Sequence, residues 1–512
     1  MKRPTVPFRF AALVALVIGM AMPGAMLTAP SVAAASATDW PMYLHDSSLS
    51  GASTETILSS AAAPNLRPLW TFKTGGVIAA SATVVGGVAY VGSWDGFEYA
   101  LNAATGALIW KTSLGITSAP ACSPPSLGIS SVAAVVGGVV YVGGGDSNWY
   151  ALNAATGAVL WSVPTGDNSA TGGHYNWSSP LIVGNSAYIG IASLGDCPLV
   201  QGQLLRVDLS THLVVATANF VPTGQVGGGI WTTPAIDTAT NTIYVTTGTR
   251  NMASQTNSES MVALDATTLA IKSDWQIPRS AANADSDWGS SPILFADANN
   301  RAMVAGIDKN GFLYAFDRTN LALGPIWSEQ IAIGGICPTC GDASVSSMAF
   351  AQGLLFVGGG NTTIGGVGYA GAIRAINPTT GGWYGQKAWP TRSSPLSPMT
   401  TAWSSPAPDR ASRSSTPPPA TGCSATPPAP SSTRHLRSPT ASSTSAPATA
   451  TSTPLRRRRL PSRRPTPTAR AASSARTSAG PRRQALKRSL RVRGPSRRVA
   501  PESQARRISS AS

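Results

Sequence analysis

The C-terminal part of this chain lacks aromatic side chains. Residues 408–512 contain no Phe, Tyr or Trp, and they hold 22 Lys and Arg against two acidic residues, Asp409 and Glu502. Such a stretch cannot bury enough apolar surface to offset the conformational entropy lost on folding. We therefore predict a disordered tail, rich in Arg, Ser and Pro, over residues 408–512.

The rest of the chain lacks excess positive charge. Residues 1–407 carry 16 basic side chains (38 − 22) and 20 acidic ones (22 − 2), a net charge of −4. The formal charge of +16 therefore arises in the tail, and the preceding residues do not suggest a nucleic-acid-binding face. We expect no specific nucleic-acid partner. Salt-sensitive adsorption of the tail to a polyanion is a weaker alternative.

No run long and apolar enough to span a membrane follows the N-terminal segment. That segment has basic residues up to Arg9, a short apolar run broken by Gly and Pro, and small residues up to Ala37. This order is typical of a secretory signal peptide. We predict a signal peptide over residues 1–37, cleavage near Ala35 or Ala37, a secreted or extracytoplasmic protein, and no membrane span after cleavage. An uncleaved membrane anchor is the alternative.

Cysteine is scarce. Four of the five cysteines precede the tail, and an even number suits disulfides in an oxidising compartment: Cys122, Cys197, Cys337 and Cys340. The C-x-x-C pair Cys337 and Cys340 predicts a local structural disulfide, ahead of a redox or metal-binding role. Gly341 follows this pair, so the C-x-x-C-H motif that attaches haem is absent.

The chain repeats itself at a period of 51 residues. Residues 84–110 read VVGGVAYVGSWDGFEYALNAATGALIW, and residues 135–161 read VVGGVVYVGGGDSNWYALNAATGAVLW. A fixed period of about 40 to 50 residues in strand-rich sequence indicates the blades of a β-propeller. Within each copy we expect four antiparallel strands, a five-residue turn at Asn102–Gly106, and an outer strand closed by Trp110 or Trp161.

Looser copies continue the pattern. They begin near residues 178, 232, 290 and 346, which gives six legible blades, and a seventh begins at residues 402–407 (AWSSPA) and is then lost. We therefore predict an all-β propeller over residues 38–407, with seven or eight blades intended and an incomplete C-terminus. Residues 39–51 contain no repeat and are expected to pack beside the ring or help to close it.

A shifted reading frame would explain the loss of the pattern. Displaced by one base, the codons of residues 442–454 (SSTSAPATATSTP) can encode IVYIGSGNGYLYA. This matches residues 139–151 (VVYVGGGDSNWYA) except at Gly144 and Trp149. A natural basic tail is the alternative, and sequencing the gene near codons 406–413 decides between the two.

The repeats resemble those of propellers related to pyrroloquinoline quinone (PQQ) dehydrogenases, in particular the polyvinyl alcohol dehydrogenase-like branch of quinoproteins. The resemblance covers about residues 39–384 and depends mainly on three segments: DWPMYLHDSSLSG (39–51), GGGIWTTPAIDTATNTIYVTTGTRN (227–251) and DKNGFLYAFDRTN (308–320). It implies the propeller fold strongly and the activity weakly, because related propellers also serve as non-catalytic scaffolds.

The resemblance also implies PQQ and calcium as cofactors, with residues to hold them. Trp231 stands where family members place the Trp that stacks on PQQ, and Lys309 matches the basic residue near the quinone oxygens. Asn251 matches the calcium-binding Asn, and Asp285 and Asp287 lie near the segment with the catalytic Asp. Each also has a structural interpretation: blade packing for the Trp, turn positions for the Lys and Asn, and solvated loop acids for the two Asp.

Some features of the family are missing. The adjacent Cys-Cys pair found over the cofactor is absent, and so is the calcium-binding Glu, for which only Asp196 is available as a substitute. His174 is more readily a structural histidine than a residue of the central face.

Two functions from different classes follow. The first is a quinoprotein alcohol dehydrogenase, impaired by its disrupted C-terminus, which transfers hydride from a small-molecule or polymeric alcohol to PQQ and passes electrons to a separate acceptor. The second is a binding or assembly propeller that needs no cofactor. The substrate and the oligomeric state are not fixed by the sequence.

Overall fold

The computed structural model describes residues 39–122, 124–337 and 340–390. They all belong to one compact unit, Met1–Ala425, whereas the second unit, Thr426–Ser512, lies outside the described residues. The predicted signal peptide, the start of the seventh blade at 402–407 and the tail also lie outside them. Across the described ranges no helix is long and apolar enough to cross a membrane.

The first three of six four-stranded repeats, here called blades 1 to 6, follow the predicted strand order. Blade 1 contains β1 (Thr83–Val85), β2 (Val88–Gly92), β3 (Phe97–Asn102) and β4 (Leu108–Ser113). Blade 2 contains β7 (Ala134–Val136), β8 (Val139–Gly143), β9 (Asn148–Asn153) and β10 (Val159–Pro164). Blade 3 contains β12 (Leu181–Val183), β13 (Ser186–Ser193), β14 (Gln203–Asp208) and β15 (Leu213–Asn219).

The remaining blades have the same antiparallel pairing. Blade 4 contains β16 (Ala235–Asp237), β17 (Thr242–Thr246), β18 (Ser260–Asp265) and β19 (Ile271–Gln276). Blade 5 contains β20 (Ile293–Ala296), β21 (Ala302–Ile307), β22 (Phe312–Asp317) and β23 (Trp327–Gln330). Blade 6 contains β24 (Ala349–Ala351), β25 (Leu354–Gly359), β27 (Val367–Ile376) and β28 (Trp383–Pro390).

Shorter elements join or extend the blades. The pair β5 (Thr117–Ser118) and β6 (Ser126–Leu127) lies between blades 1 and 2, β11 (His174–Tyr175) extends blade 3, and β26 (Thr362–Ile364) extends blade 6. The 3-10 helices whose residues are all described are η1 (Ala63–Asn65) and η2 (Leu321–Leu323).

The turn between the third and fourth strands forms as its sequence predicts. In blade 1 the Asn102 side chain accepts hydrogen bonds from the amides of Ala104 and Thr105, each at 3.0 Å. Gly106 follows with φ of +71°, a conformation that other residues rarely adopt. Trp110 then donates from Nε1 to the carbonyl of Ala154 in the next blade at 2.9 Å. One motif thus fixes both the turn and the contact between neighbouring blades.

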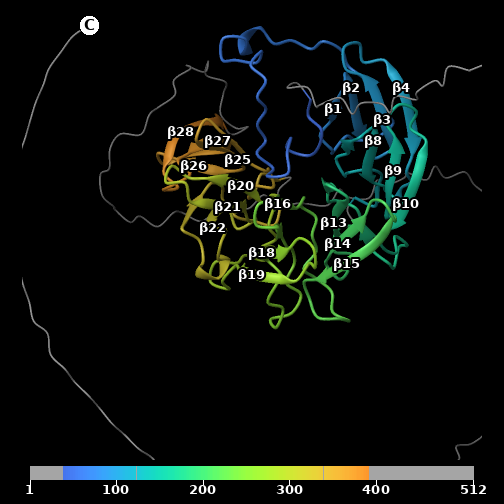
Figure 1. The fold of residues 1–512 in the computed structure, drawn as a ribbon. Helices are drawn as coiled ribbons and strands as arrows, with labels where there is room; N and C mark the ends of the chain where they lie inside the picture. The colour runs from blue at the N-terminus through green and yellow to red at the C-terminus, as the bar shows by residue number, and fades with distance from the viewer. Residues whose placement is uncertain (1–38, 123, 338–339, 391–512) are drawn as a thin grey trace, which may run out of the picture. The chain divides into compact units, whose positions relative to one another are not determined.

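The blades follow one another in chain order, with their first strands side by side (Figure 1): β1 lies beside β7, β7 beside β12, β16 beside β20 and β20 beside β24. The core lies between the blades, where apolar side chains from facing sheets form separate clusters. These observations confirm the predicted all-β propeller and its six legible blades.

The N-terminal segment 39–51 runs along the inner strands rather than forming a blade. Its backbone carbonyls accept hydrogen bonds from five blades: Val84 bonds to Trp40, Val135 to Pro41, Ile236 to Ser47, Leu294 to Ser48 and Phe350 to Ser50. Tyr43 also donates to the hydroxyl of Ser347 at 3.0 Å. The segment therefore connects the first blade to the sixth across the inner strands.

Two disulfides are present among the described residues. Cys337 pairs with Cys340, which confirms the predicted local bridge, and Cys122 pairs with Cys197 across 75 residues of sequence. The longer bridge packs against Trp94, Tyr175 and Trp177. It anchors the loop that follows β13.

Candidate functional site

A cavity of about 440 Å³ opens where loops of blades 3, 4 and 5 meet. It is lined by residues after β13, before β16, after β17, before β20 and after β21. Four of the five predicted site residues line it: Trp231, Asp285, Asp287 and Lys309. The structure therefore brings together residues that lie up to 78 positions apart in the chain.

Trp231 presents its ring to this cavity beside a cation. Lys309 Nζ lies 5.3 Å from the centroid of the ring, within the range of a cation–π contact. The indole Nε1 of Trp231 is buried and has no hydrogen-bond partner among the described residues. The ring and the ammonium group together form a surface suited to a flat, anionic aromatic molecule.

Lys309 also forms ion pairs with Asp285 and Asp287. Its Nζ donates to the two carboxylate oxygens of Asp285 at 3.1 and 3.0 Å, and to Asp287 Oδ2 at 3.3 Å. Burial alone would lower the pKa of Lys309, but the charges of Asp287 and Asp285 outweigh burial and raise this pKa. Burial raises the pKa of Asp287 to about 6, and the nearby Lys309 limits that rise. Lys309 therefore remains charged when either carboxylate is ionised.

A threonine connects this group to a third carboxylate. Asp287 Oδ1 accepts from the amide and, at 3.0 Å, from the hydroxyl of Thr249, and that hydroxyl also lies 3.0 Å from Asp196 Oδ2. A Cβ on Gly248 would lie only 2.9 Å from Asp287 Oδ1. Glycine at this position therefore lets the loop after β17 approach the carboxylate closely.

Asn251, the predicted metal ligand, is the one predicted site residue outside the lining of this cavity. Asn251 is exposed and does not line the cavity, and its amide donates to Gln255 Oε1 at 2.9 Å. Thr249, directly after Gly248, and Asp196, in the loop after β13, face the cavity instead. His174 bonds through Nδ1 to the carbonyls of Asp167 and Gly172, in keeping with its structural interpretation.

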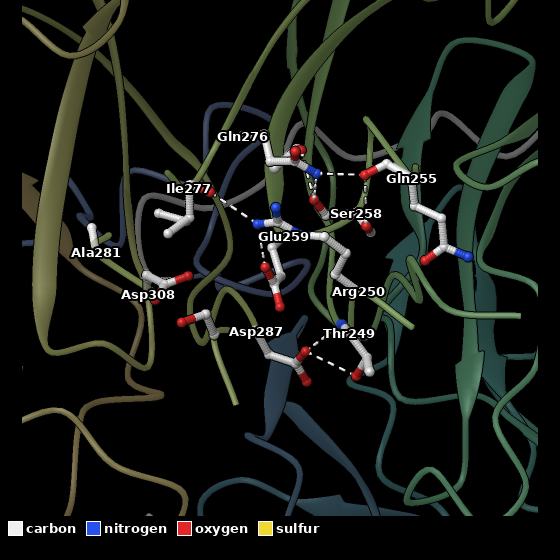
Figure 2. Close-up of polar contacts among 12 residues, drawn as sticks. Thr249, Arg250, Gln255, Ser258, Glu259, Gln276, Ile277, Ala281, Asp287 and Asp308 are labelled. Atoms are coloured by element: carbon white, nitrogen blue, oxygen red, sulfur yellow. Dashed lines mark hydrogen bonds and ion pairs between the residues drawn. The ribbon is translucent and has the colours of Figure 1, made fainter. Parts of the chain in front are cut away.

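A buried polar network lies behind Thr249 (Figure 2). Arg250 forms an ion pair with Glu259 and donates to the carbonyl of Ile277 at 2.9 Å. The Gln276 side chain donates to the carbonyls of Gln255 and Ser258, each at 2.7 Å. This network fixes both ends of the loop between β17 and β18, and so determines where Thr249 lies.

Asp308 lies at the edge of the same network and is fully buried. Its Oδ1 accepts from the amide of Asn310 at 2.8 Å, while its Oδ2 has no partner among the described residues. Burial raises the pKa of Asp308 well above its usual range. Asp308 thus adds a buried acidic side chain directly before Lys309.

The donors around the cavity fit a hard cation and a flat cofactor. Asp196, Thr249 and Asp287 offer oxygen atoms, which Ca²⁺ and related ions prefer. Within the described ranges, however, no three His, Cys, Asp or Glu side chains are already arranged as a metal-binding group. Lys309 and Thr249 bond the carboxylates, so these side chains would have to turn towards a cation on binding.

The repeats also match a known family along the chain. The PQQ_2 family model, described as "Outer membrane protein assembly factor BamB", matches residues 54–320. The chain belongs to the PQQ_2 family. The match covers blades 1 to 4 and most of blade 5, including all the residues that line the cavity except Ile336.

Curated relatives carry the names of quinoprotein dehydrogenases. The chain is 28% identical over 316 residues to polyvinylalcohol dehydrogenase of Sphingopyxis sp., covering 53% of this chain and 47% of that protein. It is 27% identical over 320 residues to quinoprotein ethanol dehydrogenase of Pseudomonas putida, covering 50% of each. The chain spans about half the length of the curated relatives it matches. It is a PQQ-repeat protein similar to quinoprotein dehydrogenases.

Solved structures agree on the fold. Quinohemoprotein alcohol dehydrogenase from Comamonas testosteroni matches with a TM-score of 0.53 at 20% identity, over 69% of this chain and 67% of that one. A europium-containing methanol dehydrogenase matches with a TM-score of 0.58 at 18% identity, over 69% and 79%. At these identities the likeness establishes the propeller fold and does not assign a reaction.

The long disulfide should contribute more stability than the short one. In the chain-entropy model, closing a loop of 75 residues stabilises by about 4.5 kcal/mol, and closing one of three residues by about 1.6 kcal/mol. We expect the Cys122→Ala, Cys197→Ala double variant to lose between two and three times as much free energy of unfolding as the matched Cys337→Ala, Cys340→Ala variant. Urea denaturation of both measures this, and equal losses would contradict it.

Proposed function

We propose that this chain is a quinoprotein-type alcohol dehydrogenase that binds PQQ and a divalent cation in the cavity of blades 3 to 5. The observation that supports this most is the meeting of Trp231, Lys309, Asp285 and Asp287 in one cavity. Three separate loops supply these four residues, and the resemblance to quinoproteins names all four. When bound, PQQ polarised by the cation would supply the hydride acceptor.

The residues of the chain then take distinct roles. The Trp231 ring packs against the flat cofactor, and Lys309 pairs with its anionic oxygens. The oxygen atoms of Asp196, Thr249 and Asp287 hold the cation, in place of the ligand expected at Asn251. Calcium is the ion implied by the resemblance.

Asp285 is the proton acceptor in this proposal. Its side chain retains 30% exposure, so an alcohol in the cavity can reach it, whereas Asp287 is enclosed by Thr249 and Lys309. The ammonium of Lys309 lies 3.0 Å from Asp285 Oδ2 and holds this carboxylate in place at the cavity. Removing the hydroxyl proton as hydride leaves the carbon converts the alcohol to a carbonyl compound.

We also propose that the protein is secreted and that its disrupted C-terminus impairs it. The two disulfides suit an oxidising compartment, in keeping with a leader over residues 1–37. A basic tail without aromatic residues would leave the propeller of residues 38–407 without its last blades. Substrate class and electron acceptor follow the resemblance: a small or polymeric alcohol and a separate acceptor.

The test uses PQQ with Ca²⁺ and a reducible dye. Asp285→Asn should leave PQQ binding, followed by quenching of Trp fluorescence, within about threefold of the parent, and should lower dye reduction by about 100-fold or more, the usual cost of losing a general base. Asp274→Asn, in β19 outside the cavity lining, is the matched control and should retain both.

The alternative is a binding or assembly propeller without a cofactor, which the description of the matched family model favours. The two proposals differ in one measurement, PQQ binding by a chain with its reading frame restored. If such a chain binds no PQQ in the presence of Ca²⁺, the dehydrogenase proposal is wrong and the scaffold is favoured.

A further inference from the structure

Trp70 makes the contacts of an outer-strand tryptophan although it precedes blade 1. Its Nε1 donates to the carbonyl of Ala103 at 2.9 Å, just as Trp110 donates to Ala154 and Trp327 to Pro378 at the same distance. Trp110 belongs to β4 and Trp327 to β23, the fourth strands of their blades. Trp70 therefore occupies the fourth-strand position of a blade preceding blade 1.

The other strands of that blade are missing from the described residues. Residues 66–77 form no strand and pair with no described strand. Leu69, just before the tryptophan, is 77% exposed, whereas the equivalent Ile109 and Ile326 are 47% and 44% exposed. Residues 66–77 thus lie on blade 1, and none of the described strands pairs with their outer edge.

A series of hydrogen bonds between the entry segments of neighbouring blades also ends at blade 6. At the entries of blades 2 to 5, a backbone amide donates to a hydroxyl of the next blade: Val132 to Ser179, Ser179 to Thr233, Thr233 to Ser291 and Ser291 to Ser347. These hydroxyl residues are 2–4% exposed in blades 3 to 5.

This series of amide-to-hydroxyl hydrogen bonds is incomplete at both ends. Among the described residues, the amide of Ser347 in blade 6 has no acceptor. Ser81, at the same position of blade 1, is exposed and receives no bond from a described residue. The amide of Ser347 and the hydroxyl of Ser81 thus remain without a described partner, on the two sides where the entry segment of a further blade would lie.

The face of blade 6 is also open. Ile373 pairs with Gly358 in the register in which Leu204 pairs with Gly190. Leu204 and its counterparts Met261 and Leu313 are fully buried against the next blade, but Ile373 is 44% exposed. In Figure 1 the blue segment of described residues that precedes β1 lies between blade 6 and blade 1.

We propose that this open flank, made of residues 66–77, Ser81, Ser347 and Ile373, is a docking surface for a further β-sheet of the same repeat. Its third strand pairs with residues 66–77, and its entry hydroxyl accepts from the amide of Ser347. Addition of strands to a free edge is an established mode of recognition, with backbone hydrogen bonds giving affinity and side-chain pockets giving specificity.

The occupant is a polypeptide with the Tyr-Val-Gly and Ala-Leu-Asn strands of this repeat, because Trp70, Ser81 and Ser347 repeat the contacts that neighbouring blades make with one another. Residues 391–512 are long enough for such a sheet, but the part after residue 407 has no aromatic residue to pack on Ile373. The displaced frame of residues 442–454 would supply one. This proposal does not depend on the proposed dehydrogenase function.

The test adds a synthetic peptide with the sequence of residues 139–153, VVYVGGGDSNWYALN, to the full chain. Hydrogen–deuterium exchange should slow by about tenfold or more across residues 66–77. Residues 108–113, already paired with β3, should not change, and a scrambled peptide should protect neither segment.

A matched pair of variants locates the peptide. Ile373→Lys should weaken peptide binding by about tenfold or more, because a charge would be buried at the interface. Ile271→Lys, in β19 and 40% exposed, should not. Both residues are exposed, so neither change should prevent folding.

Three outcomes would overturn the proposal. The first is no protection of residues 66–77 by the peptide. The second is full protection in the chain alone at low concentration, which would mean that its own C-terminal residues already fill the flank. The third is protection that rises with protein concentration while sedimentation shows a dimer, which would assign the flank to a second copy of the chain. PQQ binding does not enter any of these measurements.

Discussion

Glu98→Met is expected to raise the free energy of unfolding at pH 7 by roughly 2–3 kcal/mol. Glu98 in β3 is fully buried, and both of its carboxyl oxygens lack a hydrogen-bond partner among the described residues. It lies between blades 1 and 2, close to Ile129. The same register position holds Trp149, Leu204, Met261 and Leu313 in blades 2 to 5. A methionine at position 98 would therefore give blade 1 an apolar side chain at the position where blades 2 to 5 bury one.

The effect should depend on pH in a defined direction. Burial raises the pKa of Glu98 well above its usual value near 4.5. Below that value the side chain is protonated in both folded and unfolded chains, so it contributes no pH dependence. Above it the unfolded chain loses the proton first, and stability falls by about 1.4 kcal/mol per pH unit until the folded pKa is reached.

Urea denaturation between pH 4 and pH 8 measures this. The difference between Glu98→Met and the parent should be smallest near pH 4 and should grow as the pH rises. Glu98→Gln is the matched control: it should remove the same pH dependence but gain less stability, because its amide also lacks partners. A constant difference across this pH range would show that Glu98 is ionised in the folded chain.

The fold was readable from sequence because each blade repeats the same local signals. The Asn-Ala-Ala-Thr-Gly turn, the alternating strands and the closing Trp are determined within about 30 residues, and the turn forms as expected around Asn102 and Gly106. The burial of Glu98 was not readable in the same way, because it depends on contact with blade 2. Its alignment with Trp149 in the neighbouring copy was the available signal.

The site was readable in part. The order of Trp231, Asp285, Asp287 and Lys309 along the chain indicated residues that the structure brings into one cavity. Thr249 was missed because the deciding feature is the close approach of the backbone at Gly248, after which the chain turns away and leaves Asn251 exposed. The link from Thr249 to Asp196 was also invisible, since it joins loops of different blades.

Arg250→Met is expected to lower the free energy of unfolding by about 3–5 kcal/mol, the cost of leaving a charge buried without its partner. The side chains of Arg250 and Glu259 are only 3% and 10% exposed, and the two form an ion pair. Arg250 also bonds to the carbonyl of Ile277, which would lose its charged donor. Lys272→Met is the matched control: its pair with Asp265 is 37% and 27% exposed, and its loss should cost about 1 kcal/mol or less.

The double variant Arg250→Met, Glu259→Met separates the loss of the ion pair itself from the cost of leaving Glu259 buried and unpaired. If the large loss comes from unpaired Glu259, the second substitution should restore most of the stability, because two apolar side chains can replace a buried ion pair with little penalty. Denaturant unfolding of the four proteins in this cycle gives the coupling energy directly. A double variant no more stable than Arg250→Met would mean that Arg250 acts through Ile277 and the loop carrying Thr249. In that case the proposed binding of PQQ should weaken together with stability, because the loop would no longer hold Thr249 beside Asp287.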